Sequence, residues 1–336
     1  MVHDHDTDSL SSTTTASFSV DMAIGAIDGQ GVTTTVTDGS EAITATYGFQ
    51  IDLNTSFTGE DSLDISLDAG NGSATTVGEL DLNSASEALT VDGVSYTFPV
   101  GDKTTVFVGD NTDGSALYST ACVYGGPTNT LDDCGNVNSA LGSGNGTAAG
   151  ASFDIGNGFT AAIGYTGEGS SQKGLLSKES ADAFGGQLTY TGDSYGLSAT
   201  YANIESNTST TDSTALAESD TTYWALNGYW TPSESGSMPS ISVGYETGDS
   251  EVATTADTST FFVGLQWDEV GPGTFGAAMG TTGHISDGAT EYYMYEAFYS
   301  YPVNDGMTIT PVVYVKELAS PSMDETGVMV KTSFSF

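Results

Sequence analysis

Carboxylate side chains lie among the polar residues that alternate with apolar ones in several stretches of this chain. Asp64 and Asp68 alternate with the apolar residues of 61–68, and Asp52 lies within a similar alternation over 41–53. A spacing of two places side chains on one face of an extended strand. If that face lined a water-filled space, its carboxylates would attract cations and repel anions. The charged residues that the alternation assigns to this face are Asp21, Asp52, Asp64, Asp68, Glu246, Glu296, Lys316 and Lys331.

The overall charge excludes several classes of protein. The chain has 336 residues, of which 44 are acidic and 5 are basic, all of them lysines, for a net charge of −39. Nucleic acid is excluded as a partner, because binding phosphates needs a basic surface. Of the 3 histidines, His3 and His5 lie in the polar start of the chain, which leaves His284. We therefore expect no enzyme built on a histidine-centred site. His284 itself falls in a predicted external loop, where a lone histidine is normally solvated.

Two cysteines, Cys122 and Cys134, lie 12 positions apart in a segment rich in glycine, asparagine and aspartate. This arrangement predicts a local disulfide formed in an oxidising compartment. The alternative is a pair of buried free thiols.

The segment around these cysteines, 111–149, is the least strand-like part of the chain. A loop of this length in a compact domain is usually functional or disordered. We expect it either to fold inward as a constriction or to remain at the mouth as a surface loop. No cofactor is expected, although clustered carboxylates in the loop leave Ca²⁺ as a candidate ligand. The carboxylates that this loop could present are Asp110, Asp113, Asp132 and Asp133.

Alternation by twos continues through most of the chain, and no segment holds a helical period beyond two turns. The breaks between strands alternate in length: 204–220 and 317–326 are long, whereas 192–195 and 303–306 are short. Strands of about ten residues joined in this way are typical of a transmembrane β-barrel. The pattern predicts an all-β antiparallel barrel of about 16 strands, with long loops on one side and short turns on the other. We assign 1–15 to a flexible lead-in and 16–336 to the barrel.

The two faces of the predicted strands differ in chemistry. One is apolar, with tyrosine and tryptophan near the strand ends, as expected where a barrel meets the membrane interface. The other is made of glycine, small polar residues and carboxylates, as expected of a surface that faces water inside a barrel. This division of faces predicts a lipid bilayer as the barrel's surroundings.

Three segments resemble the major outer-membrane porins of cyanobacteria, which are related to the carbohydrate-selective porins. They are YGFQIDLNTSFTGEDSLDISLDAGN (47–71), VDGVSYTFPVGDKTTVFVG (91–109) and YMYEAFYSYPVNDGMTITPVVYVKE (293–317), followed by a last strand ending in Phe336. The resemblance implies a homotrimer in the cell outer membrane that passes small hydrophilic solutes and inorganic ions. Some members of this family are iron-uptake porins.

The chain departs from the family in two respects. Members usually begin with a surface-layer-homology domain, and this sequence has none. The family also carries lysine and arginine after the TSFTG element, where this chain has Glu60, Asp64 and Ser66. The loss of these basic groups argues against anion passage.

Together these features predict a passive diffusion channel that prefers cations. The alternative is an extracellular structural or adhesive β-protein, since such proteins are also acidic and poor in lysine. The terminal strand ending in phenylalanine and the alternation of long and short connections favour the channel, because an adhesin needs neither.

Overall fold

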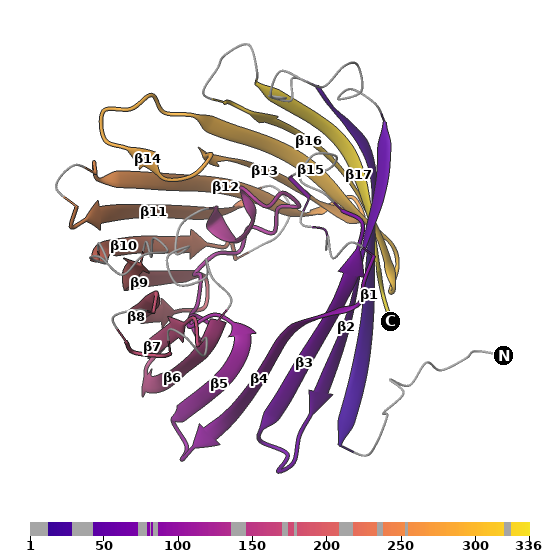
Figure 1. The fold of residues 1–336 in the computed structure, drawn as a ribbon. Helices are drawn as coiled ribbons and strands as arrows, with labels where there is room; N and C mark the ends of the chain where they lie inside the picture. Colours follow the sequence, from indigo (N-terminus) through magenta and orange to yellow (C-terminus); the bar gives the residue numbers. More distant parts are fainter. Residues whose placement is uncertain are drawn as a thin grey trace.

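The computed structural model shows one closed, antiparallel β-barrel of sixteen strands within the residues it describes (Figure 1). The described residues are 13–28, 43–72, 79–80, 82, 87–135, 146–169, 174–177, 180–207, 218–233, 238–252, 255–318 and 324–336. The all-β barrel and its strand number, predicted from the alternation, are therefore confirmed.

The strands follow one another around the wall in chain order. A two-residue strand, β14, pairs with β12 beside the barrel's main ladder. A short 3-10 helix, η1 (Asp132–Cys134), lies between β5 and β6. The first eight wall strands are β1 (Thr14–Asp28), β2 (Thr44–Thr55), β3 (Ser62–Gly70), β4 (Thr90–Val100), β5 (Thr104–Thr112), β6 (Gly146–Gly156), β7 (Phe159–Gly167) and β8 (Asp182–Thr191). The remaining strands are β9 (Tyr195–Asn207), β10 (Glu218–Trp230), β11 (Ser240–Ser250), β12 (Thr258–Val270), β13 (Gly273–Thr281), β14 (Ile285–Ser286), β15 (Tyr293–Asn304), β16 (Met307–Lys316) and β17 (Glu325–Ser335).

The barrel closes where the first strand pairs with the last. β1 pairs with β2 on one side and with β17 on the other, with Asp21 opposite Ser333 and Ala23 opposite Lys331. Beyond this ladder, Phe18 and Phe336 exchange backbone hydrogen bonds of 2.9 and 3.0 Å. Their rings are also stacked, with centroids 5.7 Å apart. Closure pairs the backbone groups that an open sheet edge would leave unsatisfied.

The connections have the predicted asymmetry. Short turns such as 157–158 and 305–306 join strands at one end of the barrel, and long connections such as 113–145 and 282–292 join them at the other. One boundary differs from the prediction: β1 begins at Thr14, which pairs with Thr55. The last two residues of the predicted lead-in therefore belong to the wall, and residues 1–12 lie outside the described part.

The outer face of the wall is apolar and exposed. Trp224 and Leu226 of β10 are 60% and 63% exposed, while Ala225, which lies between them, is buried inside the barrel. Exposed aromatic residues, including Tyr201 and Tyr245, occupy the same outer face. None of the described residues forms a helix with the length and apolar character needed to cross a membrane.

Residues 113–135, which we call the inward segment, lie inside the ring of strands (Figure 1). Apolar residues of this segment, among them Tyr124 and Leu131, join buried wall residues such as Phe262 and Met294 in one cluster. The hydrophobic core of this molecule therefore sits within the barrel, between the inward segment and the wall.

Candidate functional site

Polar side chains of the wall hold the backbone of the inward segment. Gln187 of β8 accepts a hydrogen bond of 2.7 Å from the backbone N–H of Ser119, and Ser242 of β11 accepts one of 3.0 Å from Val123. Gln266 of β12 accepts a third, also 3.0 Å, from Gly125. A buried loop must satisfy its backbone donors, and these side chains do so. The segment thus crosses the inner wall from β8 to β12.

Small residues of the wall leave room for the segment. A Cβ atom at Gly264 would lie 2.7 Å from the ring of Tyr124, and one at Gly164 would lie 1.9 Å from the carbonyl oxygen of Gly114. Both approaches are closer than carbon side chains tolerate. Glycine on the inner face is therefore a packing requirement at these two positions.

The disulfide between Cys122 and Cys134, which the sequence predicts, is present. Its Cα atoms are 5.9 Å apart, and Cys134 is fully buried against the apolar cluster inside the barrel. The bridge therefore closes the part of the inward segment that packs against β12 and β15.

Glu296 of β15 anchors the same part of the segment. Its two carboxylate oxygens accept hydrogen bonds of 2.6 Å from the Tyr124 hydroxyl and from the Thr128 hydroxyl. Burial, together with the nearby Glu296, raises the pKa of the Tyr124 phenol well above its usual value. Tyr124 therefore remains a hydrogen-bond donor at any physiological pH.

A second stretch of chain reaches the lumen from the β3–β4 connection. Leu80 forms an isolated antiparallel bridge with Thr128, and the backbone N–H of Asn129 donates a hydrogen bond of 2.7 Å to the carbonyl of Glu79. The Glu79 carboxylate is paired with Lys316 at the end of β16. We call Glu79, Leu80 and Leu82 the inner brace.

His284 departs from its prediction. Instead of standing in solvent, its Nε2 lies 2.8 Å from a carboxylate oxygen of Glu246, and its Nδ1 lies 3.0 Å from the Thr258 hydroxyl. Its ring packs edge-on against Tyr223. The loop after β13 folds back over the wall, so that His284 covers the carboxylate of β11.

Two of the eight predicted lumen residues are almost fully buried, and a third is partly covered. Glu246 and Glu296 are 1% and 5% exposed, because His284 and the inward segment cover them. Lys316 is 21% exposed and is partly covered by Glu79 and Thr130. These three side chains lie on the inner face of the wall in contact with other inward-folded parts of the chain, and their role in lining the passage stays a prediction.

The other predicted side chains lie on the inner face of β1 to β3 and β17. Asp52 accepts hydrogen bonds from Gln50 (2.8 Å) and Ser66 (2.7 Å), and Asp64 accepts one of 2.6 Å from Asn54. Polar neighbours therefore fix these carboxylates against the wall. Asp68 is held likewise by Thr90.

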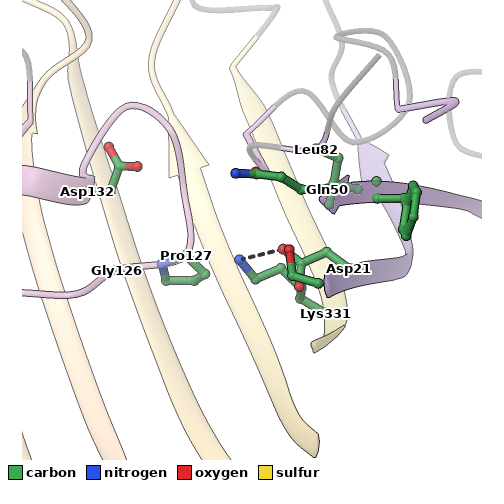
Figure 2. A pocket seen from close by; sticks show the side chains of 10 residues that line it. Asp21, Gln50, Leu82, Gly126, Pro127, Asp132 and Lys331 are labelled. Carbon is green, nitrogen blue, oxygen red and sulfur yellow. Dashed lines mark ion pairs between the residues drawn. The ribbon is translucent and has the colours of Figure 1, made fainter. Parts of the chain in front are cut away.

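A cavity of about 280 Å³ separates the inward segment from the opposite wall. Asp21 and Lys331 lie on the wall side, with Nζ of Lys331 3.8 Å from a carboxylate oxygen of Asp21 (Figure 2). Gly126, Pro127 and Asp132 face them from the inward segment (Figure 2). At this level the lumen is narrowed by the chain's own fold.

A second cavity, of about 260 Å³, lies along β3, β4 and β5. Asp64, Asp92 and Asp113 contribute carboxylates to its lining, and none of its lining residues is basic. Together the two cavities trace the space that the inward segment leaves beside β17 and β1 to β5.

The four candidate carboxylates of the 111–149 loop have different positions. Asp132 lines the first cavity and Asp113 the second, while Asp133 is exposed in η1. Asp110 belongs to β5 and accepts a hydrogen bond of 3.0 Å from Thr147. Residues 136–145 of this loop lie outside the described part. The described residues bring no three potential metal ligands together, and the Ca²⁺ prediction stays untested.

The structure is therefore an all-β closed antiparallel barrel with one segment of the chain folded into its lumen.

No family model and no curated protein matches the chain. Solved porin structures do match. OprB of Pseudomonas putida superposes with a TM-score of 0.65 at 11% identity, covering 96% of this chain and 94% of that one. An anion-selective porin from Comamonas acidovorans gives 0.66 at 13%, covering 96% and 99%. A loop-deletion mutant of OmpT from Vibrio cholerae gives 0.61 at 11%, covering 96% and 99%. At these identities the likeness shows the fold.

Several site residues escaped the sequence reasoning. Glu79, Tyr124 and Thr128 lie in polar, irregular stretches where no alternation assigns a face. Leu80 and Leu82 carry a signal that could have been used. Two leucines spaced by two in a connection rich in Gly, Ser, Thr and Asn indicate a stretch whose side chains are buried. The partners of these residues come from strands far along the chain, and a local pattern does not identify them.

Proposed function

We propose that this chain is a porin of the cell outer membrane, through which small hydrophilic solutes and inorganic ions diffuse passively. The observation that carries the proposal is the lumen: a closed barrel, apolar outside, whose polar interior is narrowed by the inward segment but keeps open space beside β1 to β5. The bacterial porins that share the fold support this function. A channel of this kind needs no catalytic group, which agrees with the scarcity of histidine.

The passage prefers cations. Asp21, Asp64 and Asp132 contribute carboxylates to the two cavities, and Lys331 is the one basic residue among the described residues that line them. The ammonium of Lys331 lies beside Asp21, so that part of its field is already neutralised. A water-filled constriction with excess carboxylate lowers the energy of cations and raises that of anions. The neighbour from Comamonas acidovorans is anion-selective by its description, so selectivity in this chain has to come from its own side chains.

The finer assignment follows the sequence resemblance. The three segments at 47–71, 91–109 and 293–317 support a porin of the cyanobacterial type, in a lipid bilayer and as a homotrimer. The exposed apolar outer wall suits contact with lipid and with other copies of the chain.

The test is a planar bilayer held under a KCl gradient. Stepwise conductance with a reversal potential of cation-selective sign is the expected result. A variant with Asp21→Asn and Asp132→Asn should move the reversal potential towards zero, whereas Asp305→Asn, in the exposed turn between β15 and β16, should leave it unchanged. Conductance with an anion-selective potential would overturn the cation preference, and no conductance from folded protein would overturn the channel itself.

A further inference from the structure

We propose that Glu79 and Lys316 are positioning residues that set the width of the lumen, by holding the inner brace between the wall and the inward segment. This inference rests on the proposed channel function. Lys316 is the last residue of β16 and Glu79 lies 237 positions earlier, in the β3–β4 connection. Their ion pair therefore joins this connection to the wall.

The Lys316 ammonium contacts both inward-folded stretches of chain. Besides its ion pair with Glu79, it donates a hydrogen bond of 3.3 Å to the Thr130 hydroxyl of the inward segment. Backbone contacts complete the junction, because Leu80 bridges Thr128 and the carbonyl of Glu79 accepts from Asn129. The Lys316 ammonium therefore contacts the inner brace and the inward segment at the point where the two are joined.

Burial makes this cation necessary. The Glu79 side chain is 6% exposed, and one of its carboxylate oxygens has no hydrogen-bond partner among the described residues. Glu296 is a second buried carboxyl group close to Glu79, and Glu325 lies opposite Lys316 in the β16–β17 register. A buried carboxylate is stable only with a compensating charge or donors. Without Lys316, the Glu79 carboxylate must take up a proton or leave the interior, and at neutral pH we expect the brace to withdraw with it.

The rest of the brace is held by apolar contact. Leu80 and Leu82 are buried in the same cluster as Ile27, Met329 and Leu131. Leu82 also lines the first cavity, facing the passage (Figure 2). Withdrawal of the brace would therefore widen the passage where it is narrow and uncover the edge of the inward segment. Lys316 lines neither of the two cavities, which separates its role from that of a pore charge.

The test compares Lys316→Met with Lys331→Met in single-channel recordings. Lys316→Met should raise the mean conductance about 1.5-fold and add fluctuations, because the brace no longer fills the lumen. Its reversal potential should move less than that of Lys331→Met, which removes a charge from the passage itself. Lys316→Arg should retain the wild-type conductance, and Glu79→Lys combined with Lys316→Glu should restore it in part.

A cross-link separates positioning from a general loss of packing. Residues bridged as Leu80 and Thr128 have Cα atoms about 5 Å apart, within reach of a disulfide. In the double variant Leu80→Cys, Thr128→Cys, oxidation should return the conductance of Lys316→Met to that of the same double variant with Lys316 intact. Reduction should raise the conductance of this variant again by more than it changes that of the wild type, in which the same treatment opens the Cys122–Cys134 bridge. Wild-type conductance from folded Lys316→Met, or a conductance that the cross-link leaves raised, would overturn the proposal.

The brace can also be measured without a channel. In detergent, the same cysteine pair should oxidise about ten-fold more slowly in the Lys316→Met background, since release of the brace lowers the effective concentration of its thiol. An equal rate would overturn the positioning role. If the unmodified protein does not conduct, the proposed function fails, and this rate still decides whether the ion pair holds the brace.

Discussion

The carboxylate of Glu296 accepts a hydrogen bond from the phenol of Tyr124, a residue 172 positions earlier in the chain. The same carboxylate accepts from Thr128, so one wall residue fixes two points of the inward segment from within the barrel. Hydrogen bonds to a charged, buried acceptor are among the stronger ones in proteins. The position of the narrowed part of the lumen therefore depends on β15, which lies far along the chain from the inward segment.

We expect Glu296→Gln to destabilise the protein by about 2 kcal/mol, the usual size for a hydrogen bond to a charged group. A carboxamide offers one acceptor oxygen and turns its NH2 group towards the other hydroxyl, so either Tyr124 or Thr128 can no longer donate to residue 296. Unfolding in urea, followed by tryptophan fluorescence, measures the change. Glu60→Gln is the matched control, because its side chain is exposed and should alter stability by less than about 0.5 kcal/mol. Equal effects of the two substitutions would contradict the anchoring role.

A valine at Gly264 should displace the inward segment. The Cβ atom would lie 2.7 Å from the ring of Tyr124 and equally close to that of Phe262, and overpacking of this kind costs about 1–3 kcal/mol. We expect a lower midpoint of unfolding together with an altered single-channel conductance. Gly283→Ala provides the comparison, since no atom lies within 4 Å of its added Cβ. A Gly264→Val protein with unaltered conductance would show that Tyr124 can move without moving the constriction.

Removing the disulfide should destabilise the inward segment more than the wall. A ring closed by cysteines 12 positions apart contributes about 3 kcal/mol in the chain-entropy description. In the Cys122→Ser, Cys134→Ser variant we expect faster proteolysis within 113–135 and noisier channels, with the β-sheet circular dichroism signal unchanged. Loss of that signal would instead place the bridge among the determinants of the barrel itself.

The turn before β3 should give the protein an acid-sensitive stability. Asp61 accepts hydrogen bonds from the hydroxyls of Tyr96, Thr58 and Ser56. These bonds, chiefly that from Tyr96, hold the pKa of the Asp61 carboxyl well below its usual range. A folded-state pKa below the unfolded value of about 3.9 stabilises the fold above that pH, and the contribution is lost as the pH falls through the folded pKa.

Asp61→Asn should therefore be less stable than wild type at neutral pH, and the difference should shrink as the pH falls below about 4. Urea midpoints across this range measure it, with Glu60→Gln as the neighbouring control. A difference that does not change with pH would mean that the turn depends on shape rather than on the charge of Asp61.

Asp52 and Glu296 show which features of the inner face can be predicted from the sequence. Strict alternation assigned both to the inner face, because side-chain direction in a strand has a period of two and is a local property. Asp52 lies on the inner face of β2, held by Gln50 and Ser66. Glu296 lies under Tyr124, because what covers a wall residue depends on a segment of the chain that folds in from far away.

His284 shows the same limit in a loop. A lone histidine between strands carries no pattern, and its partner Glu246 lies 38 positions earlier on another strand. The disulfide, in contrast, was predictable because Cys122 and Cys134 are close in sequence and are the 2 cysteines of the chain. Local spacing thus predicts strands, faces and short-range bridges, whereas the inward anchors depend on contacts across the barrel.

The pairing of Phe18 with Phe336 has a consequence for biogenesis. The seam of the barrel joins β1 to β17, so β1 has no partner on that side until β17 has been synthesised. A chain cut short by one strand would present two unpaired edges, which are prone to join edges of other chains. Because this contact spans almost the whole sequence, its formation is expected to be slow and to come at the end of assembly.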